Sequence, residues 1–273
     1  MIGTRHQNGS SKGDRDMQTF SSDGVEIAYL DTAVEDAGAR GKPTVLLIHG
    51  FASNVATNWV QTGWVRTLTD AGFRVVALDN RGHGASAKLY AIEDYGAPIM
   101  AEDARRLLDH LDLPHAHVMG YSMGARITAF LLIKHPTRVA SAVFGGLGVN
   151  MVEGMKGRGD DIAEALEAAH LDDVTEPGAR MFRAFAEQTK SDLKALAACM
   201  RSARVRITPD DLARVTCPVL VAVGTDDPIA GSPAELAALI PGGQFLDIAG
   251  RDHNKAVGDR VFKSTVLGFL KKA

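Results

Sequence analysis

The segment Gly-Tyr-Ser-Met-Gly at residues 120–124 places the strongest constraint on how this chain can fold. An apolar run of strand-like residues, 116–119, precedes it, and residues 125–132 follow with the apolar spacing of a helix. A serine between two glycines at such a junction requires a very tight turn, because glycine lets neighbouring backbone come close. The turn would expose the hydroxyl of Ser122 beside the N-terminal N–H groups of the next helix. The segment therefore predicts a strand, a sharp turn with a candidate serine nucleophile, and a helix.

Apolar runs typical of buried strands alternate with helical patterns along most of the chain. A hairpin is expected around Asp23-Gly24, between strands at 19–21 and 25–30. Further strands are expected at 45–48, 73–79, 116–119, 139–144, 218–224 and 244–248, and helices at 59–70, 100–111, 125–132, 233–240 and 257–270. Short strand–helix repeats of this kind predict an α/β fold with a mostly parallel, doubly wound sheet covered by helices.

The strand rhythm disappears between residues 150 and 207, where three helices are expected at 161–170, 179–188 and 192–203. We expect this helical block to lie over the carboxyl ends of the strands, where open α/β sheets bind ligands. The α/β core then consists of residues 17–149 and 208–273. Residues 1–16 are polar and are expected to form a disordered leader.

Composition narrows the classes of function. The 30 basic and 33 acidic residues give a formal net charge of −3 and are mixed along the chain, which argues against nucleic-acid binding. Two cysteines give no disulfide framework. No apolar run approaches the roughly 18 residues that span a bilayer, and the N-terminus lacks an apolar signal core. We therefore expect a cytoplasmic protein that does not bind membranes.

A serine nucleophile needs a base, and three histidines follow predicted strands. His253 comes after the last strand, at the carboxyl edge of the sheet that also holds Ser122, and is our candidate base. His49 precedes a glycine and His83 lies inside a glycine-rich turn, so structural roles are expected for both. His49 would hold the turn that presents Phe51.

The base in turn needs a carboxylate to orient it. Asp226 and Asp227 follow the strand that ends at Gly224, at the same edge of the sheet as His253. We assign this role to Asp227, with Asp226 as the alternative.

Acyl transfer also needs two backbone N–H groups that hold the oxyanion. The N–H of Met123, just after the serine, and that of Phe51, in the loop after an early strand, are the candidates. Four aromatic side chains are candidates for an apolar substrate pocket: Tyr121, Trp59, Phe182 and Phe185.

The chain order Ser122, Asp227, His253, with His-Gly-Phe at 49–51, resembles the α/β-hydrolase superfamily over about residues 19–271. Residues 79–86 match its D-x-R-G-H-G-x-S loop, and residues 224–227 its G-x-x-D acid loop. The resemblance implies a helical cap at 150–207 and a serine hydrolase that acts on a small-molecule carboxylic ester or lactone. No metal or organic cofactor is implied.

Two residues qualify the resemblance. Asp252 stands directly before His253, where many relatives have glycine, and it either tunes the histidine or caps the last helix. Ser122 disfavours dehalogenases and epoxide hydrolases of this fold, which would be expected to carry aspartate there. Carbon–carbon bond hydrolases, thioesterases and cofactor-free perhydrolases share these core motifs and stay open as alternatives. A small-molecule receptor that keeps the fold is the alternative from another class.

Overall fold

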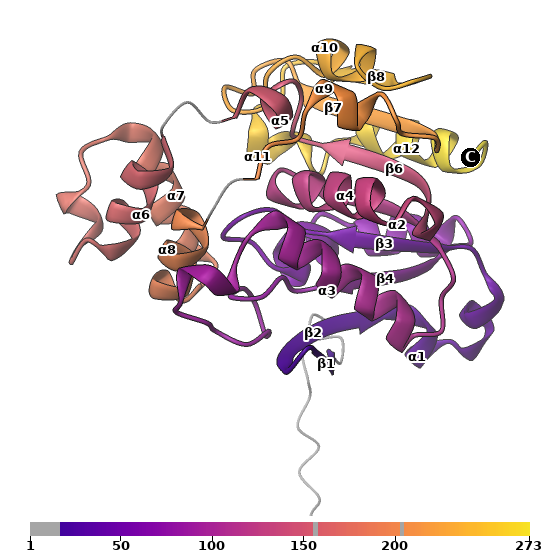
Figure 1. Cartoon of the computed structure of the whole chain (residues 1–273), viewed down its shortest axis with the longest axis horizontal. Helices are drawn as coiled ribbons and strands as arrows, with labels where there is room; N and C mark the ends of the chain where they lie inside the picture. Colours follow the sequence, from indigo (N-terminus) through magenta and orange to yellow (C-terminus); the bar gives the residue numbers. More distant parts are fainter. Residues whose placement is uncertain (1–16, 155–157, 203–204) are drawn as a thin grey trace, which may run out of the picture.

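An eight-stranded sheet runs through the part of the chain that the computed structural model describes, residues 17–154, 158–202 and 205–273 (Figure 1). The leader predicted at residues 1–16 lies outside the described residues. The strands are β1 (Gln18–Ser22), β2 (Val25–Asp31), β3 (Thr44–Ile48), β4 (Arg74–Leu78), β5 (Ala116–Tyr121), β6 (Val139–Gly145), β7 (Val219–Gly224) and β8 (Gln244–Ile248).

The strand order is β1-β2-β4-β3-β5-β6-β7-β8, and every neighbouring pair from β4 to β8 is parallel. β1 and β2 form the predicted antiparallel hairpin, whose turn residues Asp23 and Gly24 both have positive φ. β2 then pairs antiparallel with β4. The predicted mostly parallel sheet is confirmed. The parallel strands end at one edge, so the loops that follow β3, β5, β7 and β8 meet there.

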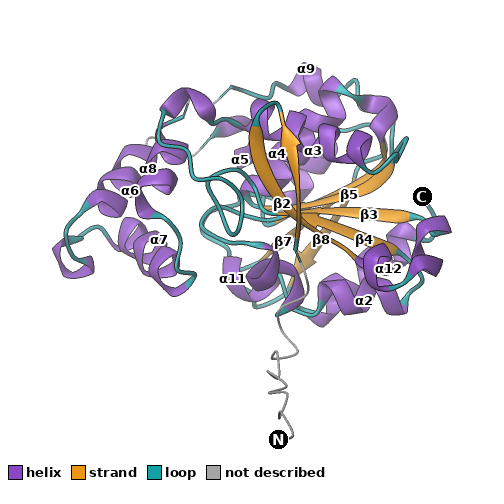
Figure 2. Cartoon of the chain, turned by 90° about the horizontal axis from the view of Figure 1, so that it is seen from below, coloured by secondary structure: helices purple, strands orange, loops and turns teal. Residues whose placement is uncertain are grey.

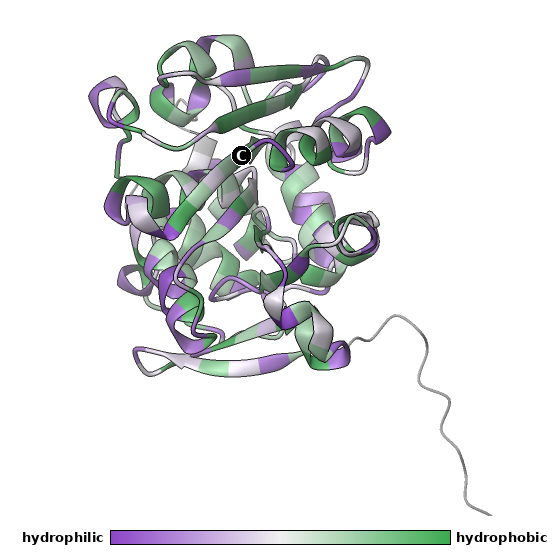
Figure 3. Cartoon of the chain, turned by 90° about the vertical axis from the view of Figure 1, so that its right-hand side faces the viewer, coloured by the Kyte–Doolittle hydropathy of each residue, from purple (hydrophilic) through white to green (hydrophobic). Residues whose placement is uncertain are grey.

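Helices cover both faces of the sheet because its strands are apolar on both sides. In β3, Leu46 and Ile48 join the core beneath α3 (Ala97–His110) and α4 (Met123–Lys134). Val45 and Leu47 join the core beneath α2 (Trp64–Asp70) and α12 (Arg260–Leu270). This alternation follows from the two-residue period of a strand. Figure 3 shows apolar residues concentrated on the central strands, with helices that carry both apolar and polar residues.

The helices alternate with the strands as the sequence predicts. The α-helices are α1 (Thr32–Glu35), α2 (Trp64–Asp70), α3 (Ala97–His110), α4 (Met123–Lys134), α5 (Asn150–Glu153), α6 (Arg158–Glu167), α7 (Pro177–Gln188), α8 (Leu193–Arg201), α9 (Pro209–Leu212), α10 (Pro233–Ala238), α11 (His253–Ala256) and α12 (Arg260–Leu270). The described ranges also contain the 3-10 or π turns η1 (Ala37–Gly41), η2 (Ala56–Val60), η3 (Ile92–Asp94), η4 (Pro136–Arg138) and η5 (Leu171–Asp173). In the described ranges, no helix has both the length and the apolar character needed to cross a membrane.

Helices α6, α7 and α8 lie together to one side of the sheet, between β6 and β7 in the chain (Figures 1 and 2). Polar contacts join the end of α7 and the start of α8 to the rest of the chain. The Thr189 hydroxyl donates to the carbonyl of Ala52 at 2.8 Å, and the Tyr90 hydroxyl donates to Asp192 at 2.9 Å. The ring of Phe182, on α7, also packs edge-on against Phe51. These contacts bring α7 against the loop that follows β3.

One predicted helix differs from the structure. Residues 59–70 were expected to form a continuous helix, but the π-helical turn η2 ends at Val60 and α2 begins only at Trp64. Gly63, between them, has φ of 80° and starts α2 from a left-handed conformation. An i,i+3,i+4 pattern does not register such a break, because the apolar residues on both sides still face the same core.

Candidate active site

Ser122 lies alone between the end of β5 and the start of α4, with φ of 55° and ψ of −114°. Positive φ is strained for a residue other than glycine, and this strain is typical of functional turns. A Cβ on Gly120 would lie 2.1 Å from the carbonyl oxygen of Gly124, and a Cβ on Gly124 would lie 2.0 Å from that of Ile48. Both positions therefore accept only glycine, and this requirement explains the pattern seen in the sequence.

His253 and Asp227 are joined by a hydrogen bond of 2.7 Å between Nδ1 and Oδ2. The Asp227 side chain is fully buried, and its other oxygen accepts the backbone N–H groups of Ile229 and Ala230 at 2.8 and 3.1 Å. Three donors therefore converge on the carboxylate and hold it in one orientation. The neighbouring Asp226 is exposed, and its Oδ1 accepts only the hydroxyl of the adjacent Thr225 among the described side-chain contacts. The structure thus places Asp227, and not Asp226, against the histidine.

The loop that carries His253 is fixed on three sides. A Cβ on Gly224 would lie 2.0 Å from the carbonyl of Arg251, so the end of β7 and this loop are in direct contact. The Tyr121 hydroxyl donates to the His253 carbonyl at 2.5 Å. Asp252 accepts the N–H groups of Asn254 and Lys255 and is the N-cap of α11. Asp252 thus caps a helix, but this is the short helix α11 and not the last helix α12, whose N-cap is Asp259.

The loop after β3 lies directly beside the serine. A Cβ on Gly50 would lie 3.4 Å from the Cβ of Ser122, so Phe51 follows at the edge of the same space. Met123 is the first residue of α4, where N–H groups have no partner within the helix. Among the described residues, no hydrogen bond uses the N–H of Phe51 or that of Met123. Both groups are therefore available to an oxyanion.

Two cavities meet at Ser122. The first, of about 180 Å³, is lined by Ser122 and His253 together with Phe51, and the second, of about 110 Å³, by Ser122, Phe51 and Met123. The described hydrogen bonds include none between the Ser122 hydroxyl and the His253 ring. Such bonds are often long before substrate binds.

Three of the four predicted pocket residues line the first cavity: Tyr121, Phe182 and Phe185. Trp59 does not, and this prediction is wrong. Its side chain is fully buried in the core beneath α2, where it packs edge-on against Trp64 at 6.5 Å between ring centroids. Trp59 thus belongs to the same core cluster as Trp64, on the other side of the break at Gly63.

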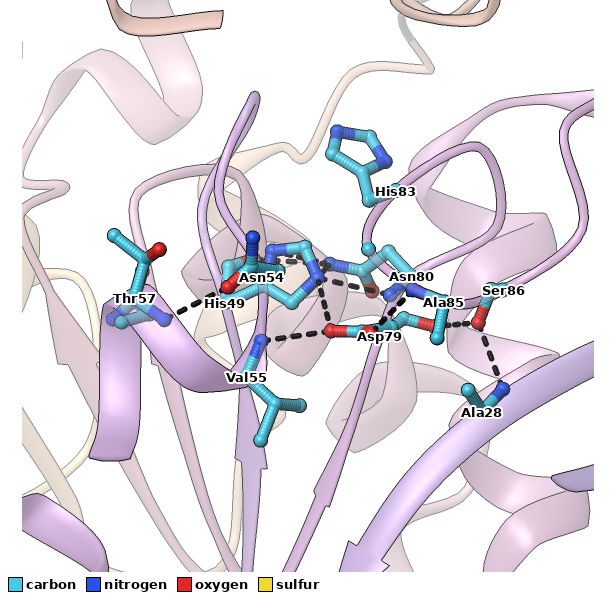
Figure 4. A network of polar contacts seen from close by, with 12 residues as sticks. Ala28, His49, Asn54, Val55, Thr57, Asp79, Asn80, His83, Ala85 and Ser86 are labelled. Atoms are coloured by element: carbon cyan, nitrogen blue, oxygen red, sulfur yellow. Dashed lines mark hydrogen bonds and ion pairs between the residues drawn. The ribbon is translucent and has the colours of Figure 1, made fainter. Parts of the chain in front are cut away.

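A buried polar network connects the loops after β3 and β4 behind the site (Figure 4). His49 Nδ1 lies 2.7 Å from the carbonyl of Gly50, and its Nε2 accepts the N–H of Asn80 at 3.0 Å. Asp79 accepts the N–H groups of Val55 and Ala85, both at 2.7 Å. These bonds hold the two loops together and fix the turn that leads to Phe51.

His49 and the neighbouring His83, whose ring centroids lie 5.3 Å apart, are both neutral near pH 7. Burial lowers the pKa of His49 to about 4, and burial together with the nearby His49 lowers the pKa of His83 to about 3. The same burial raises the pKa of Asp79. Neither His49 nor His83 lines a cavity at Ser122, and a base with such a low pKa would accept a proton poorly.

Other polar residues of the first cavity were not foreseen from the sequence. Ser53, Thr57 and Asn58 line it, from the loop and π-helical turn that follow β3. Nothing in their local pattern marks them, because they precede the stretch with helical spacing. In the described part of the chain, no group of three or more histidine, cysteine or acidic side chains could hold a metal ion.

Comparison with known proteins gives one matching family, described as alpha/beta hydrolase fold, whose model matches residues 43–200. The non-heme chloroperoxidase CPO-A1 of Kitasatospora aureofaciens is 28% identical, over 92% of this chain and 98% of that protein. Epoxide hydrolase A of Mycobacterium tuberculosis is 36% identical, but over only 43% of this chain and 35% of its own. The crystal structure of a hydrolase from Pseudomonas aeruginosa aligns with a TM-score of 0.75 at 27% identity, covering 93% of this chain and 98% of that one.

Proposed function

Because the chain belongs to the α/β-hydrolase fold family and is an enzyme of that fold, we propose that it is a serine hydrolase that cleaves a carboxylic ester or lactone. The observation that carries this proposal is the bond of 2.7 Å between His253 Nδ1 and buried Asp227, with His253 and Ser122 on one cavity wall. That arrangement supplies a nucleophile, a base and an orienting carboxylate.

In the proposed reaction the Ser122 oxygen attacks the carbonyl carbon while His253 Nε2 takes the hydroxyl proton. Asp227 accepts the Nδ1–H and stabilises the imidazolium ion that forms. The N–H groups of Phe51 and Met123 bind the oxyanion, and each contributes about 10²–10³ in rate. The imidazolium then protonates the leaving oxygen, and an acyl-enzyme remains on Ser122. Water, deprotonated by His253, finally releases the acid.

The serine at residue 122 supports ester hydrolysis over the reaction of epoxide hydrolases, which share this fold. Epoxide hydrolases open their substrate with an aspartate at the elbow, whereas this chain carries Ser122 there. The partial match to Epoxide hydrolase A covers only 43% of this chain, so it does not outweigh the residue at the reacting position.

A panel of p-nitrophenyl esters, alkyl esters, thioesters and lactones tests the proposal. We expect turnover by the wild-type protein and loss of turnover in Ser122→Ala. Ser264→Ala, which removes an exposed hydroxyl outside both cavities at Ser122, serves as the matched control and should remain active. A fluorophosphonate should add covalently to Ser122, as measured by peptide mass spectrometry. Equal activity of Ser122→Ala and wild type would contradict the proposal.

The full-length similarity to a non-heme chloroperoxidase favours a second candidate, perhydrolysis at the same serine. Hydrogen peroxide would replace water and attack the acyl-enzyme, so that the ester bond to Ser122 breaks and a peracid leaves. The peracid would oxidise bromide in solution. Bromination of monochlorodimedone with acetate, peroxide and bromide measures this activity, and it should disappear in Ser122→Ala. A rate of bromination no higher than that of the variant would exclude this candidate.

A further inference from the structure

Arg126 brings a permanent positive charge to the wall of the second cavity at Ser122. Of the described residues that line the two cavities, Arg126 alone has an acidic or basic side chain other than histidine. A guanidinium group stays protonated at any pH at which the enzyme would work. A cavity whose wall carries one sign of charge attracts ligands of the opposite sign. The second cavity therefore suits a substrate with a negative charge.

Arg126 is held at this wall by the two helices that it joins. It follows Ser122 by one turn of α4, and its backbone N–H donates to the Ser122 carbonyl at 3.3 Å. Its Nη2 donates to the carbonyls of Asn150 and Met151 in α5, at 3.2 and 2.8 Å. Asn150 lines the second cavity as well, so the guanidinium lies where α4 and α5 meet at the cavity wall. The two carbonyls are neutral acceptors that orient the guanidinium and leave its charge in place.

The positions of the proposed catalytic groups assign the acyl part of the substrate to the second cavity. The leaving oxygen must approach His253 to be protonated, and His253 lines the first cavity but not the second. Met123, whose N–H is a proposed oxyanion donor, lines the second cavity but not the first. The alcohol part therefore occupies the first cavity, and the acyl chain extends past Met123 toward Arg126.

Helix geometry sets the length of that acyl chain. Arg126 is four residues beyond Ser122, and four residues of an α-helix rise about 6 Å. Met123 and Arg126 are three residues apart, so their side chains lie on the same face of α4. A chain of a few methylene groups can span this distance from the carbonyl carbon at Ser122.

We propose, on the basis of the serine hydrolase function above, that Arg126 binds a carboxylate at the far end of the acyl chain. The preferred substrates are then monoesters of short aliphatic dicarboxylic acids. The reaction at Ser122 is unchanged: the alcohol leaves, the acyl-enzyme carries the free carboxylate, and water releases the dicarboxylic acid. Arg126 takes part in binding and transfers no proton.

Matched pairs of substrates test this without any mutation. Monomethyl adipate and methyl 6-oxoheptanoate have the same shape, because a methyl group in the neutral ester replaces one carboxylate oxygen. Monomethyl succinate with methyl 4-oxopentanoate, and monomethyl glutarate with methyl 5-oxohexanoate, form the corresponding shorter pairs. We would measure kcat/KM by pH-stat titration at about pH 8, where the carboxylate is ionised. Each value is divided by the rate constant for hydroxide-catalysed hydrolysis. In the best pair the normalised ratio should favour the carboxylate ester by about ten- to hundredfold, the effect of a hydrogen bond to a charged group.

Two variants assign the preference to the charge of Arg126. Arg126→Met keeps much of the side-chain stem and removes the charge, so the normalised ratio should fall to about one or below. Arg126→Lys keeps the charge but not the planar group, and its ratio should lie between those of wild type and Arg126→Met. Effects on folding, on the oxyanion or on His253 apply to both esters of a pair and cancel. Arg66→Met, which removes an exposed arginine outside both cavities, is the matched control and should retain the full preference.

A further pair tests the assignment of the acyl part to the second cavity. In 5-acetoxypentanoate the carboxylate belongs to the alcohol part, and 6-acetoxyhexan-2-one is its neutral partner. The normalised ratio of this pair should be about one or below, because the alcohol part lies in the first cavity, away from Arg126. A preference equal to or larger than that of the acyl pairs would overturn the proposal.

Hydrolysis of the acyl pairs with normalised ratios near one in the wild-type enzyme would overturn the role of Arg126 alone. A preference that persists in Arg126→Met would also overturn it, and equal ratios in Arg126→Met and Arg126→Lys would show that only the shape of the side chain matters. Failure to hydrolyse these esters and the whole panel above would instead refute the proposed function, and this inference with it.

Discussion

Replacement of Asp227 by asparagine should abolish most of the turnover while leaving the fold intact. Asp227 accepts two backbone N–H groups, from Ile229 and Ala230, on one oxygen and the His253 ring on the other. In Asp227→Asn the amide oxygen must stay on the backbone donors, because only an oxygen can accept them. The amide nitrogen then faces His253 Nδ1 and donates to it. His253 is forced into the tautomer with its proton on Nε2, and it can no longer take a proton from Ser122.

The wrong tautomer of the catalytic histidine lowers kcat by about 10⁴ in a serine protease, and we expect a loss of similar size here. This corresponds to about 5.5 kcal/mol of activation free energy. KM should change little, because Asp227 does not line either cavity at Ser122. The variant retains both backbone hydrogen bonds, so its melting temperature should stay within a few degrees of wild type.

Steady-state hydrolysis of the best ester in the panel, together with thermal unfolding followed by circular dichroism, measures both effects. Asp226→Asn is the matched control, because it removes the same charge from an exposed side chain that is the next residue in the chain. Its kcat should stay within about twofold of wild type, since surface substitutions have small effects. A near-normal kcat in Asp227→Asn, or a larger loss in Asp226→Asn, would refute this reasoning.

Two further predictions concern stability. Burial lowers the pKa of His49 to about 4 and that of His83 to about 3, both from about 6.5, so only the unfolded chain binds these protons as pH falls. The contribution of these two histidines to the free energy of unfolding should therefore be fully present above pH 6.5. It should fall by up to about 2.7 kcal/mol per pH unit as the pH decreases toward 5. The raised pKa of Asp79 opposes this trend, and urea denaturation that gives a constant stability over this range would contradict it. Trp59→Ala should lower the free energy of unfolding by about 3–5 kcal/mol, because it leaves a cavity in the core. Phe185→Ala should mainly raise KM, because Phe185 lines the first cavity. The reverse pattern, measured by denaturation and kinetics, would show that Trp59 is a pocket residue.

Much of the fold could be predicted because its signals are local. The continuous apolar runs at β3, β4 and β7 correspond to strands buried on both faces, and the amphipathic pattern of α3 matches its single buried face. The helix predicted over residues 59–70 failed for the opposite reason. A π turn and a left-handed glycine change the direction of the chain without changing its apolar spacing.

The candidate site could be predicted only in part. Ser122 sits between glycines that the turn demands, so its position could be read from the pattern. Two adjacent aspartates, however, both follow the strand that ends at Gly224, and the sequence assigned the role to Asp227 with Asp226 as the alternative. Only the backbone N–H groups of Ile229 and Ala230 and the approach of His253 distinguish Asp227 from Asp226. Asp252 was ambiguous in the same way until its bonds to the first turn of α11 showed a cap.

The sequence by itself thus determined the order of strands and helices, the sheet edge at which the reactive side chains gather, and the identity of the serine at the sharp turn. These follow from periodicity and from glycine, which act over a few residues. Only the tertiary structure decided that Trp59 fills the core while Asn58, its neighbour, lines the cavity at Ser122. Hydrogen bonding and burial at that point depend on Gly50, Ser122 and the helices around them, which are distant in the chain and meet only when it folds.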